Sequence, residues 1–198
     1  EGLLRHEELP HKEGAMLIGM VSRLSSQKGF DLVLQSAERL VEMNVQLIVQ
    51  GLGDEHLVSE FQLLERQYPE HFKLFNVFDA DLAQRVYAGS DAFLMPSSFE
   101  PCGLGQLIAF RYGTVPIVRA TGGLKDTVTD GETGFVFTQR NPTDFLDAVS
   151  RARAVFGTSG WSELVANGMS VHSGWEDRAD EYIRLFELAC AKNAHIMM

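Results

Sequence analysis

The sequence predicts an α/β fold in which a mostly parallel sheet carries helices on both faces and is followed by a C-terminal helical tail. Short apolar runs typical of buried strands alternate with segments of helical periodicity along most of the 198 residues. Repeated strand–helix units of this length are typical of parallel sheets that are covered on both sides. Neither a low-complexity linker nor an internal repeat interrupts this alternation, so a single domain is expected.

The apolar runs predict strands over residues 16–21, 45–49, 72–77, 92–95, 115–118 and 135–137. Helical periodicity predicts helices over residues 31–42, 55–67, 82–88, 104–112, 142–156, 162–169 and 176–191, with a short helical turn at Gly122. Pro142 suits the first turn of its helix, because its missing N–H group would have no partner there. Asp79 and Asp81 are both candidates for the N-cap of the helix over 82–88.

Composition excludes several classes of function. The chain has 17 Lys and Arg against 27 Asp and Glu, a net charge of −10, and a general nucleic-acid-binding protein needs a basic face instead. One anionic small ligand remains compatible, since a few cations at a cleft focus a local positive field. No apolar run approaches the roughly 18 to 20 residues of a membrane span. Two cysteines are too few for a disulfide framework, which predicts a reducing compartment, by default the cytoplasm.

Charged residues and glycines follow several of the predicted strands. In open parallel sheets, ligands bind at the edge where the strands end at their carboxyl termini. The segments expected at this edge are residues 22–29, 51–54, 78–79, 96–105 and 119–123. Arg23 and Lys28 precede a predicted helix, and an arginine fork and a lysine charge near helix N–H groups suit a diphosphate. The alternative is that both are solvated loop charges.

Glu100 is a carboxylate in the loop after the fourth strand. It would repel a phosphate, so if a diphosphate lies at Arg23 and Lys28, Glu100 should face hydroxyl groups, from which a carboxylate accepts hydrogen bonds. N–H groups at a helix start, where negative charge is favoured, are then offered by Cys102, Gly103, Leu104 and Gly105. Phosphate on one side and hydroxyl groups on the other describe a nucleotide sugar. The alternative is that Glu100 is a surface carboxylate of a turn.

Other motifs are weaker signals. Thr121, Gly122 and Gly123 precede a helical turn and would present N–H groups to a phosphate or a hydroxyl, but a tight turn explains them equally well. Asp79-Ala80-Asp81 resembles a D-x-D metal motif, although helix capping is the favoured interpretation. The histidines form no H-x-x-x-H pair, so neither a structural nor a catalytic metal is predicted.

Two further features are interpreted as structural. Trp175 and Tyr182 lie at helical spacing near the C-terminus, for which core packing is the favoured explanation. Cys102 lies near a helix start, where a thiol can be acidic, but a small packing role is favoured over a redox switch.

Together, four stretches of the chain resemble bacterial glycogen synthases and plant starch synthases, with the resemblance extending from about Gly14 to Ala191. The stretches are Ser22-Arg23-Leu24 with Gln27-Lys28-Gly29, Phe99-Glu100-Pro101-Cys102-Gly103-Leu104, Arg111-Tyr112-Gly113-Thr114-Val115-Pro116, and Thr121-Gly122-Gly123-Leu124-Lys125-Asp126-Thr127-Val128. The resemblance implies one half of a GT-B fold, in which two Rossmann-like domains face each other across a cleft. Residues 1–198 would form the C-terminal, nucleotide-sugar-binding domain. The N-terminal, acceptor-binding domain would be absent, and the lack of an initiator Met also suggests a longer polypeptide.

The resemblance further implies transfer of glucose from ADP-glucose or UDP-glucose to the non-reducing end of an α-1,4-glucan, with retention and without a cofactor or metal. In that role, Arg23 and Lys28 would hold the diphosphate and Glu100 would bind glucose hydroxyls. Phe78 would lie against the base, and the helix of Trp175 would pack onto the missing domain. The compartment would be the cytoplasm, or the plastid in a plant. A non-catalytic nucleotide-sugar-binding module and another GT-B glycosyltransferase remain as alternatives.

The sequence departs from the family at two positions. Gly105 stands where family members often carry a hydroxyl residue that reaches the phosphate, so this contact is reduced to an N–H group. Ile108 stands where the related E-x₇-E transferases have a second Glu. The second departure fits glycogen and starch synthases better than the broader group, and it leaves the ribose contact unassigned.

Overall fold

The protein forms a six-stranded parallel sheet with the strand order β3-β2-β1-β4-β5-β6. A computed structural model describes residues 9–196. The strands are β1 (Met16–Val21), β2 (Val45–Gln50), β3 (Phe72–Phe75), β4 (Ala92–Met95), β5 (Val115–Arg119) and β6 (Phe135–Phe137). The predicted α/β class is confirmed. The strand order reverses between β1 and β4, and the carboxyl ends of these two strands are therefore where a ligand is expected.

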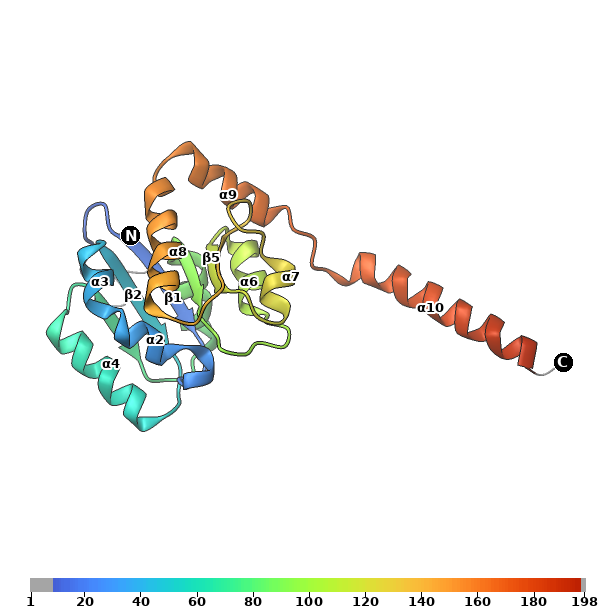
Figure 1. Cartoon of the computed structure of the whole chain (residues 1–198), viewed down its shortest axis with the longest axis horizontal. Helices are drawn as coiled ribbons and strands as arrows, with labels where there is room; N and C mark the ends of the chain where they lie inside the picture. Colours follow the sequence, from blue (N-terminus) through green and yellow to red (C-terminus); the bar gives the residue numbers. More distant parts are fainter. Residues whose placement is uncertain (1–8, 197–198) are drawn as a thin grey trace.

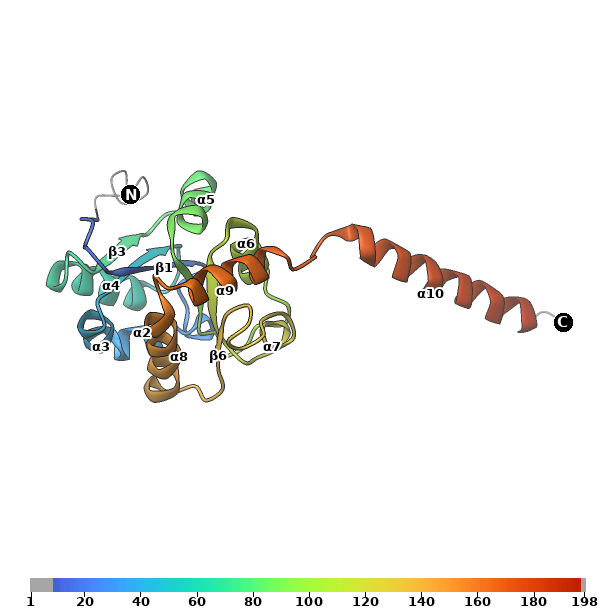
Figure 2. The ribbon, with the colours of Figure 1, turned by 90° about the horizontal axis from the view of Figure 1, so that it is seen from above.

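Helices cover both faces of the sheet (Figure 1). They are α2 (Phe30–Gln35), α3 (Ala37–Glu42), α4 (Glu55–Gln67), α5 (Ala80–Gly89), α6 (Gly105–Tyr112), α7 (Gly123–Thr127), α8 (Pro142–Val155), α9 (Ser159–Met169) and α10 (Trp175–Ile196), with a 3₁₀ helix η1 (Ser26–Lys28). Figure 2 shows α5 and α6 on the opposite side of the sheet from α2, α3 and α8.

Side chains of each strand alternate between the two layers of the core. Leu47 of β2 packs in the cluster formed with α2, α3, α4 and α8, whereas Ile48 packs with Leu82 and Val86 of α5. All six residues of β2 are buried, as expected for an inner strand of a parallel sheet. This alternation also fixes the direction of the side chain at the end of the strand, because Gln50 follows Ile48 by two residues.

Several predicted boundaries differ from the structure, among them the start of α5 at Ala80 and the start of α9 at Ser159. Two of the differences have a clear physical cause. The helix expected over 31–42 is divided at Ser36, whose hydroxyl donates to the carbonyl of Leu32 at 2.9 Å and whose φ and ψ are −106° and 1°. The third strand ends at Phe75 instead of residue 77, because Phe75 pairs with Gln50, the last residue of β2. Beyond that pair β3 has no neighbouring strand to bond.

The capping interpretation of the D-x-D motif is confirmed. One oxygen of Asp79 accepts hydrogen bonds from the N–H groups of Asp81 and Leu82, both at 2.9 Å, so Asp79 is the N-cap of α5. Within the described residues, no group of three or more His, Cys, Asp or Glu side chains gathers in a way that suits a metal. The predicted absence of a metal remains a prediction.

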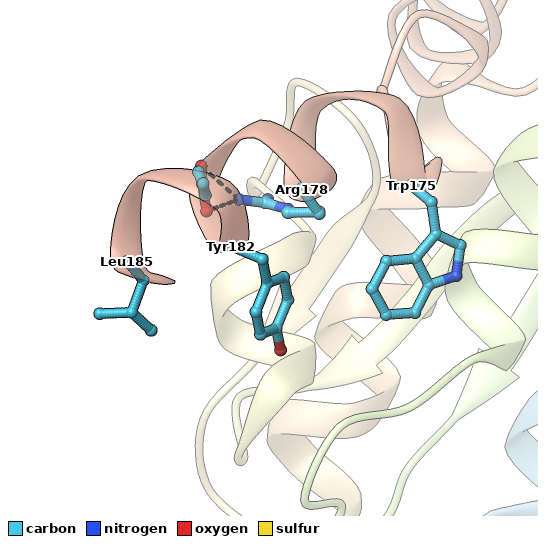
Figure 3. Close-up of a pocket in the computed structure, with 5 residues that line it drawn as sticks. Trp175, Arg178, Tyr182 and Leu185 are labelled. Carbon is cyan, nitrogen blue, oxygen red and sulfur yellow. Dashed lines mark hydrogen bonds and ion pairs between the residues drawn. The ribbon is translucent and has the colours of Figure 1, made fainter. Parts of the chain in front are cut away.

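The C-terminal helix α10 extends away from the sheet (Figures 1 and 2). The prediction that Trp175 and Tyr182 pack in the core is wrong, since they are 74% and 52% exposed. Their spacing does place them on one face of α10, with ring centroids 6.3 Å apart, but the described part of the chain does not cover that face. Trp175, Tyr182 and Leu185 line a pocket of about 530 Å³ on α10, and Figure 3 shows their side chains on the same side of the helix. Arg178, also in this pocket, donates to Glu181 at 3.1 Å. No helix among residues 9–196 has the length and apolar character needed to cross a membrane.

Candidate functional site

The loops after β1 and β4 meet through an ion pair. The ammonium of Lys28 donates to Glu100 Oε2 at 2.6 Å, and the hydroxyl of Ser97 donates to the same oxygen at 3.1 Å. The Glu100 side chain is 9% exposed and that of Lys28 is 25% exposed, so the pair lies at the edge of the protein interior. The structure therefore brings these two predicted site residues together, and it joins them directly to each other.

Backbone contacts hold the two loops in this arrangement. The carbonyl of Gln27 accepts hydrogen bonds from the N–H group and the hydroxyl of Ser98, at 2.8 and 3.1 Å. Gly29 has a φ of +81°, and a Cβ at this position would lie 2.2 Å from the carbonyl oxygen of Pro96. Only glycine tolerates both conditions. The close approach of the chain at Gly29 thus determines where the preceding Lys28 can reach.

Arg119, at the end of β5, ties the Glu100 loop to the sheet. Its guanidinium donates to the carbonyls of Ser97 at 2.7 Å, Ser98 at 2.6 Å and Thr138 at 3.3 Å. Burial, and secondarily the nearby charge of Arg140, lower the pKa of Arg119, which remains a cation because an arginine titrates far above neutral pH. The sequence predicts that Arg119 lies at the carboxyl edge of the sheet but assigns it no role. The signal that could have indicated a role is a charged arginine at the end of a buried strand.

The two glycines before α7 pack against the backbone of the Glu100 turn. A Cβ at Gly122 would lie 1.9 Å from the carbonyl oxygen of Glu100, and one at Gly123 would lie 2.1 Å from that of Cys102. The N–H group of Gly123 donates to the carbonyls of Glu100 and Pro101, each at 3.2 Å. The tight-turn explanation therefore accounts for both glycines. Thr121, which is half-buried, precedes them, and the ligand contacts predicted for all three residues stay predictions.

A buried glutamine supports the turn between Glu100 and α6. Gln106 is fully buried, and its Nε2 donates to the carbonyl of Gly103 at 2.8 Å and to the hydroxyl of Thr127 at 3.0 Å. Cys102 is exposed, so the packing role predicted for its thiol is wrong. Leu104 is also exposed, at 66%. The turn thus presents its outer side to solvent while Gln106 fixes its inner side.

Gly105 has little room for a side chain. A Cβ there would lie 3.0 Å from the Phe93 ring and 3.2 Å from the sulfur of Met95. A hydroxyl residue at this position would therefore require these neighbours to shift by a few tenths of an ångström. The departure at residue 105 is accompanied by packing that suits a glycine.

A cavity of about 790 Å³ lies at the carboxyl ends of β1 and β2. Arg23 and Phe78, both predicted site residues, are in its wall, and Phe78 is 87% exposed. Much of the remaining wall is apolar or aromatic, from Val21, Leu52, Val77, Ala80, Ala83, Tyr87, Ile108 and Tyr112. A flat, largely apolar group such as a nucleobase suits such a wall. The predicted residues therefore fall into two groups, with Arg23 and Phe78 at the cavity and Lys28 paired with Glu100.

Two tyrosines of the wall were missed by sequence reasoning. The rings of Tyr87 in α5 and Tyr112 at the end of α6 stack with centroids 6.2 Å apart and an interplanar angle of 12°. Burial raises the pKa of Tyr87 to about 12, so its hydroxyl is neutral at physiological pH. In the sequence, each tyrosine resembles an ordinary helix residue. They form one wall only because α5 and α6 bring their rings together in the folded protein.

Comparison with known proteins identifies the family. Residues 4–153 match the family described as glycosyl transferases group 1. The chain belongs to this family. Glycogen synthase of Clostridium novyi (strain NT) is 45% identical over 185 residues, covering 90% of this chain and 39% of that protein. Glycogen synthase of Bacillus anthracis is 47% identical over 192 residues, covering 93% of this chain and 40% of that protein.

A solved member of the starch synthases has the same fold as this glycosyltransferase chain. The catalytic domain of starch synthase IV from Arabidopsis thaliana, bound to ADP and acarbose, matches with a TM-score of 0.87 and 33% identity. The match covers 96% of this chain and 42% of that one. The resemblance to glycogen and starch synthases and the GT-B-like half fold are thus confirmed. The chain spans about two fifths of the length of the relatives that it matches.

Proposed function

We propose that this chain is the sugar-donor-binding part of an enzyme that transfers glucose from ADP-glucose, or UDP-glucose, to the non-reducing end of an α-1,4-glucan with retention. The observation that carries the proposal is the Lys28–Glu100 ion pair of 2.6 Å, which lies in the loops after β1 and β4, where the strand order reverses. Arg23 lies in the wall of the cavity at the carboxyl ends of β1 and β2. The names of the similar proteins, glycogen synthase and starch synthase, support the same activity.

In the proposed complex, the nucleobase enters the cavity and lies against Phe78. The diphosphate binds Arg23 and Lys28, and the N–H groups of the turn from Cys102 to Gly105 add further hydrogen bonds. Breakage of the bond between glucose and the diphosphate leaves negative charge on the nucleotide, and fixed cations stabilise that charge in the transition state. The proposal gives this task to Arg23 and Lys28 and calls for no metal or organic cofactor.

Glu100 has a double role in this proposal. A carboxylate offers about four acceptor positions, so hydrogen bonds from Lys28 and Ser97 to one oxygen leave capacity for glucose hydroxyls. The same carboxylate holds the ammonium of Lys28 at the boundary between sugar and diphosphate. The sequence predicts that Lys28 holds the diphosphate and that Glu100 faces the sugar hydroxyls, on separate sides of the ligand. Because the two side chains contact each other, the proposal now has them bind neighbouring groups of one nucleotide sugar.

The glucan acceptor and the second half of the catalytic cleft belong to the proposed N-terminal domain. The partial coverage of the relatives supports this division, since the chain spans about 39% of the Clostridium novyi protein. On its own the 198-residue chain would then bind a nucleotide sugar but transfer almost no glucose. We place the reaction in the cytoplasm, or in the plastid if the protein comes from a plant.

Calorimetric titration of the chain with ADP-glucose and ADP tests this proposal. Arg23→Ala and Lys28→Ala should each weaken ADP binding at least about tenfold, since each removes a charged contact to the diphosphate. Arg39→Ala is the matched control, because Arg39 is an exposed cation of α3 paired with Glu42. Unchanged ADP affinity in both test variants defeats the proposal. Glucose transfer by the chain alone at the rate of a two-domain synthase contradicts the division into domains.

A further inference from the structure

The loop after β2 holds the loop after β1, which carries Arg23. The N–H group of Leu24 donates to the carbonyl of Leu52, and the N–H group of Asp54 donates to the carbonyl of Leu24, both at 2.9 Å. Leu24 also forms a parallel β-bridge with Gly53. The backbone directly after Arg23 is therefore bonded through both its N–H group and its carbonyl, although it lies beyond the end of β1.

Gly51 and Gly53 allow these two loops to lie in close contact. A Cβ at Gly51 would lie 1.8 Å from the carbonyl oxygen of Ser22, and one at Gly53 would lie 2.0 Å from that of Leu24. Cβ atoms essentially never lie within 3.0 Å of another heavy atom, and a backbone oxygen cannot turn aside as the end of a flexible side chain can. Because Ser22 and Leu24 flank Arg23, a larger residue at either glycine would displace the chain that carries Arg23.

The side chain of Arg23 extends from this contact to the cavity. Leu24 is fully buried in the core cluster on the side of α2, α3, α4 and α8. Arg23 is exposed and lies in the wall of the cavity at the carboxyl ends of β1 and β2. Side chains adopt staggered rotamers, so a fixed backbone at Arg23 restricts its guanidinium to a small set of positions.

We propose that Gly51 and Gly53 position Arg23 for the diphosphate of the nucleotide sugar. This inference rests on the proposed function and adds two positioning residues that act through Arg23. The paired hydrogen bonds of a guanidinium to phosphate oxygens require a defined geometry. A displacement of about 1 Å in a group that binds a ligand is enough to lose such a contact.

Calorimetric titrations with ADP test the inference on the unmodified 198-residue chain, Gly53→Ala, Arg23→Ala and the double variant. Gly53→Ala should weaken ADP binding at least about fivefold, because the displaced guanidinium no longer meets the diphosphate. In the chain that already carries Arg23→Ala, the same substitution should change ADP affinity less than about twofold. A merely structural glycine would weaken binding by the same factor in both chains, and that result would overturn the inference. An unchanged ADP affinity in folded Gly53→Ala would overturn it as well.

Gly134→Ala is the matched control for Gly53→Ala. Gly134 directly precedes β6 at the edge of the sheet, and a Cβ there would lie 2.5 Å from the carbonyl oxygen of Pro116. The substitution introduces a similar clash with backbone away from Arg23, so it should lower the free energy of unfolding and leave ADP affinity unchanged. Equal losses of ADP affinity in Gly134→Ala and Gly53→Ala would overturn the inference.

Asp54→Pro decides the question if urea denaturation shows that Gly53→Ala is not folded. Asp54 has a φ of −62°, which proline adopts, and proline lacks the N–H group that donates to the carbonyl of Leu24. This variant should weaken ADP binding several-fold in the chain that keeps Arg23 and less than about twofold in the chain with Arg23→Ala. Equal losses in both chains, or no loss in either, would overturn the inference.

Arg23→Ala alone separates the inference from the proposed function. If it weakens ADP binding while Gly53→Ala does not act through Arg23, the positioning role is wrong and the sugar-donor site stands. If Arg23→Ala binds ADP as tightly as the unmodified chain, Arg23 does not hold the diphosphate. The inference then fails together with that part of the proposed function.

Discussion

Lys28 and Glu100 form an ion pair of 2.6 Å although 72 residues separate them in the sequence. Lys28 ends the 3₁₀ helix after β1, and Glu100 lies in the loop after β4. These are the neighbouring strands between which the order of the sheet reverses. The topology thus places a cation and an anion at the position where open α/β sheets bind ligands.

Glu100→Gln tests the assignment of Glu100 to the sugar. The substitution keeps the shape of the side chain but removes its charge, and hydrogen bonds from hydroxyls to a carboxylate are stronger than those to an amide. We expect the affinity for ADP-glucose relative to ADP to fall about tenfold, while ADP binding changes much less. Competition titrations with the two ligands measure this ratio.

The matched control for that change is Glu132→Gln. Glu132 is exposed in the loop before β6, at the opposite edge of the sheet, so its substitution removes the same charge away from the site. The assignment of Glu100 to the sugar would be wrong if the affinity for ADP-glucose relative to ADP stayed constant in Glu100→Gln. It would also be wrong if this ratio changed equally in Glu132→Gln.

Arg119→Lys should loosen the loop that carries Glu100. A lysine cannot reproduce the fork that donates to the carbonyls of Ser97 and Ser98, at 2.7 and 2.6 Å. We expect the free energy of unfolding to fall by about 2 kcal/mol, and ADP-glucose binding to weaken several-fold because Glu100 loses its support. Urea denaturation and calorimetry measure the two effects.

Arg140→Lys is the comparison for Arg119→Lys. Arg140 pairs with Asp31 at 2.6 Å, but both side chains are about one third exposed, at 34% and 31%. Its loss should cost less than about 1 kcal/mol and leave binding unchanged. Equal effects of the two substitutions would mean that Arg119 has no special place in the site.

Gly122→Ala tests the packing of the double glycine against the Glu100 turn. The added Cβ would lie 1.9 Å from the carbonyl oxygen of Glu100, and the φ of +46° is strained for any side chain. We expect a loss of roughly 3 kcal/mol in the free energy of unfolding, from overpacking and backbone strain together. Gly131→Ala separates the two causes, because Gly131 has a φ of +72° and nothing within 4 Å. It should cost only about 1 kcal/mol.

The strands were predictable from sequence because they are buried on both faces. A run such as residues 45–49 contains mostly apolar side chains, and the strand over Val45–Gln50 is buried throughout. The helix break at Ser36 was not predictable, because the apolar periodicity continues through it and the deciding bond is a hydroxyl contact to the preceding turn. The end of a helix or strand is hard to predict from the sequence when it depends on a single hydrogen bond or on the length of a neighbouring strand.

The site was predictable in part for a similar reason. Topology alone places Arg23, Lys28 and Glu100 at one edge, since each follows a parallel strand. It does not reveal that Lys28 bonds directly to Glu100, nor that Tyr87 and Tyr112 complete the cavity wall. Those contacts depend on side chains that meet across separate elements.

Titration of Tyr87 links the cavity wall to stability at high pH. Burial raises the pKa of Tyr87 to about 12, above the ordinary value of 10.0, so the folded state keeps its proton at a pH where the unfolded state has lost it. Unfolding then releases a proton between about pH 10 and pH 12, and stability falls as the pH rises through this window. Below pH 10 both states are protonated and Tyr87 contributes no slope.

Tyr87→Phe isolates this contribution from other groups that titrate at high pH. Phenylalanine keeps the ring that stacks on Phe93, with centroids 4.5 Å apart, but it has no proton to release. The free energy of unfolding of the unmodified chain should therefore fall relative to Tyr87→Phe by about 2 kcal/mol between pH 9.5 and pH 12. Urea denaturation at half-unit steps of pH measures the difference. Parallel pH profiles of the two proteins would show that the Tyr87 hydroxyl reaches solvent in the folded state.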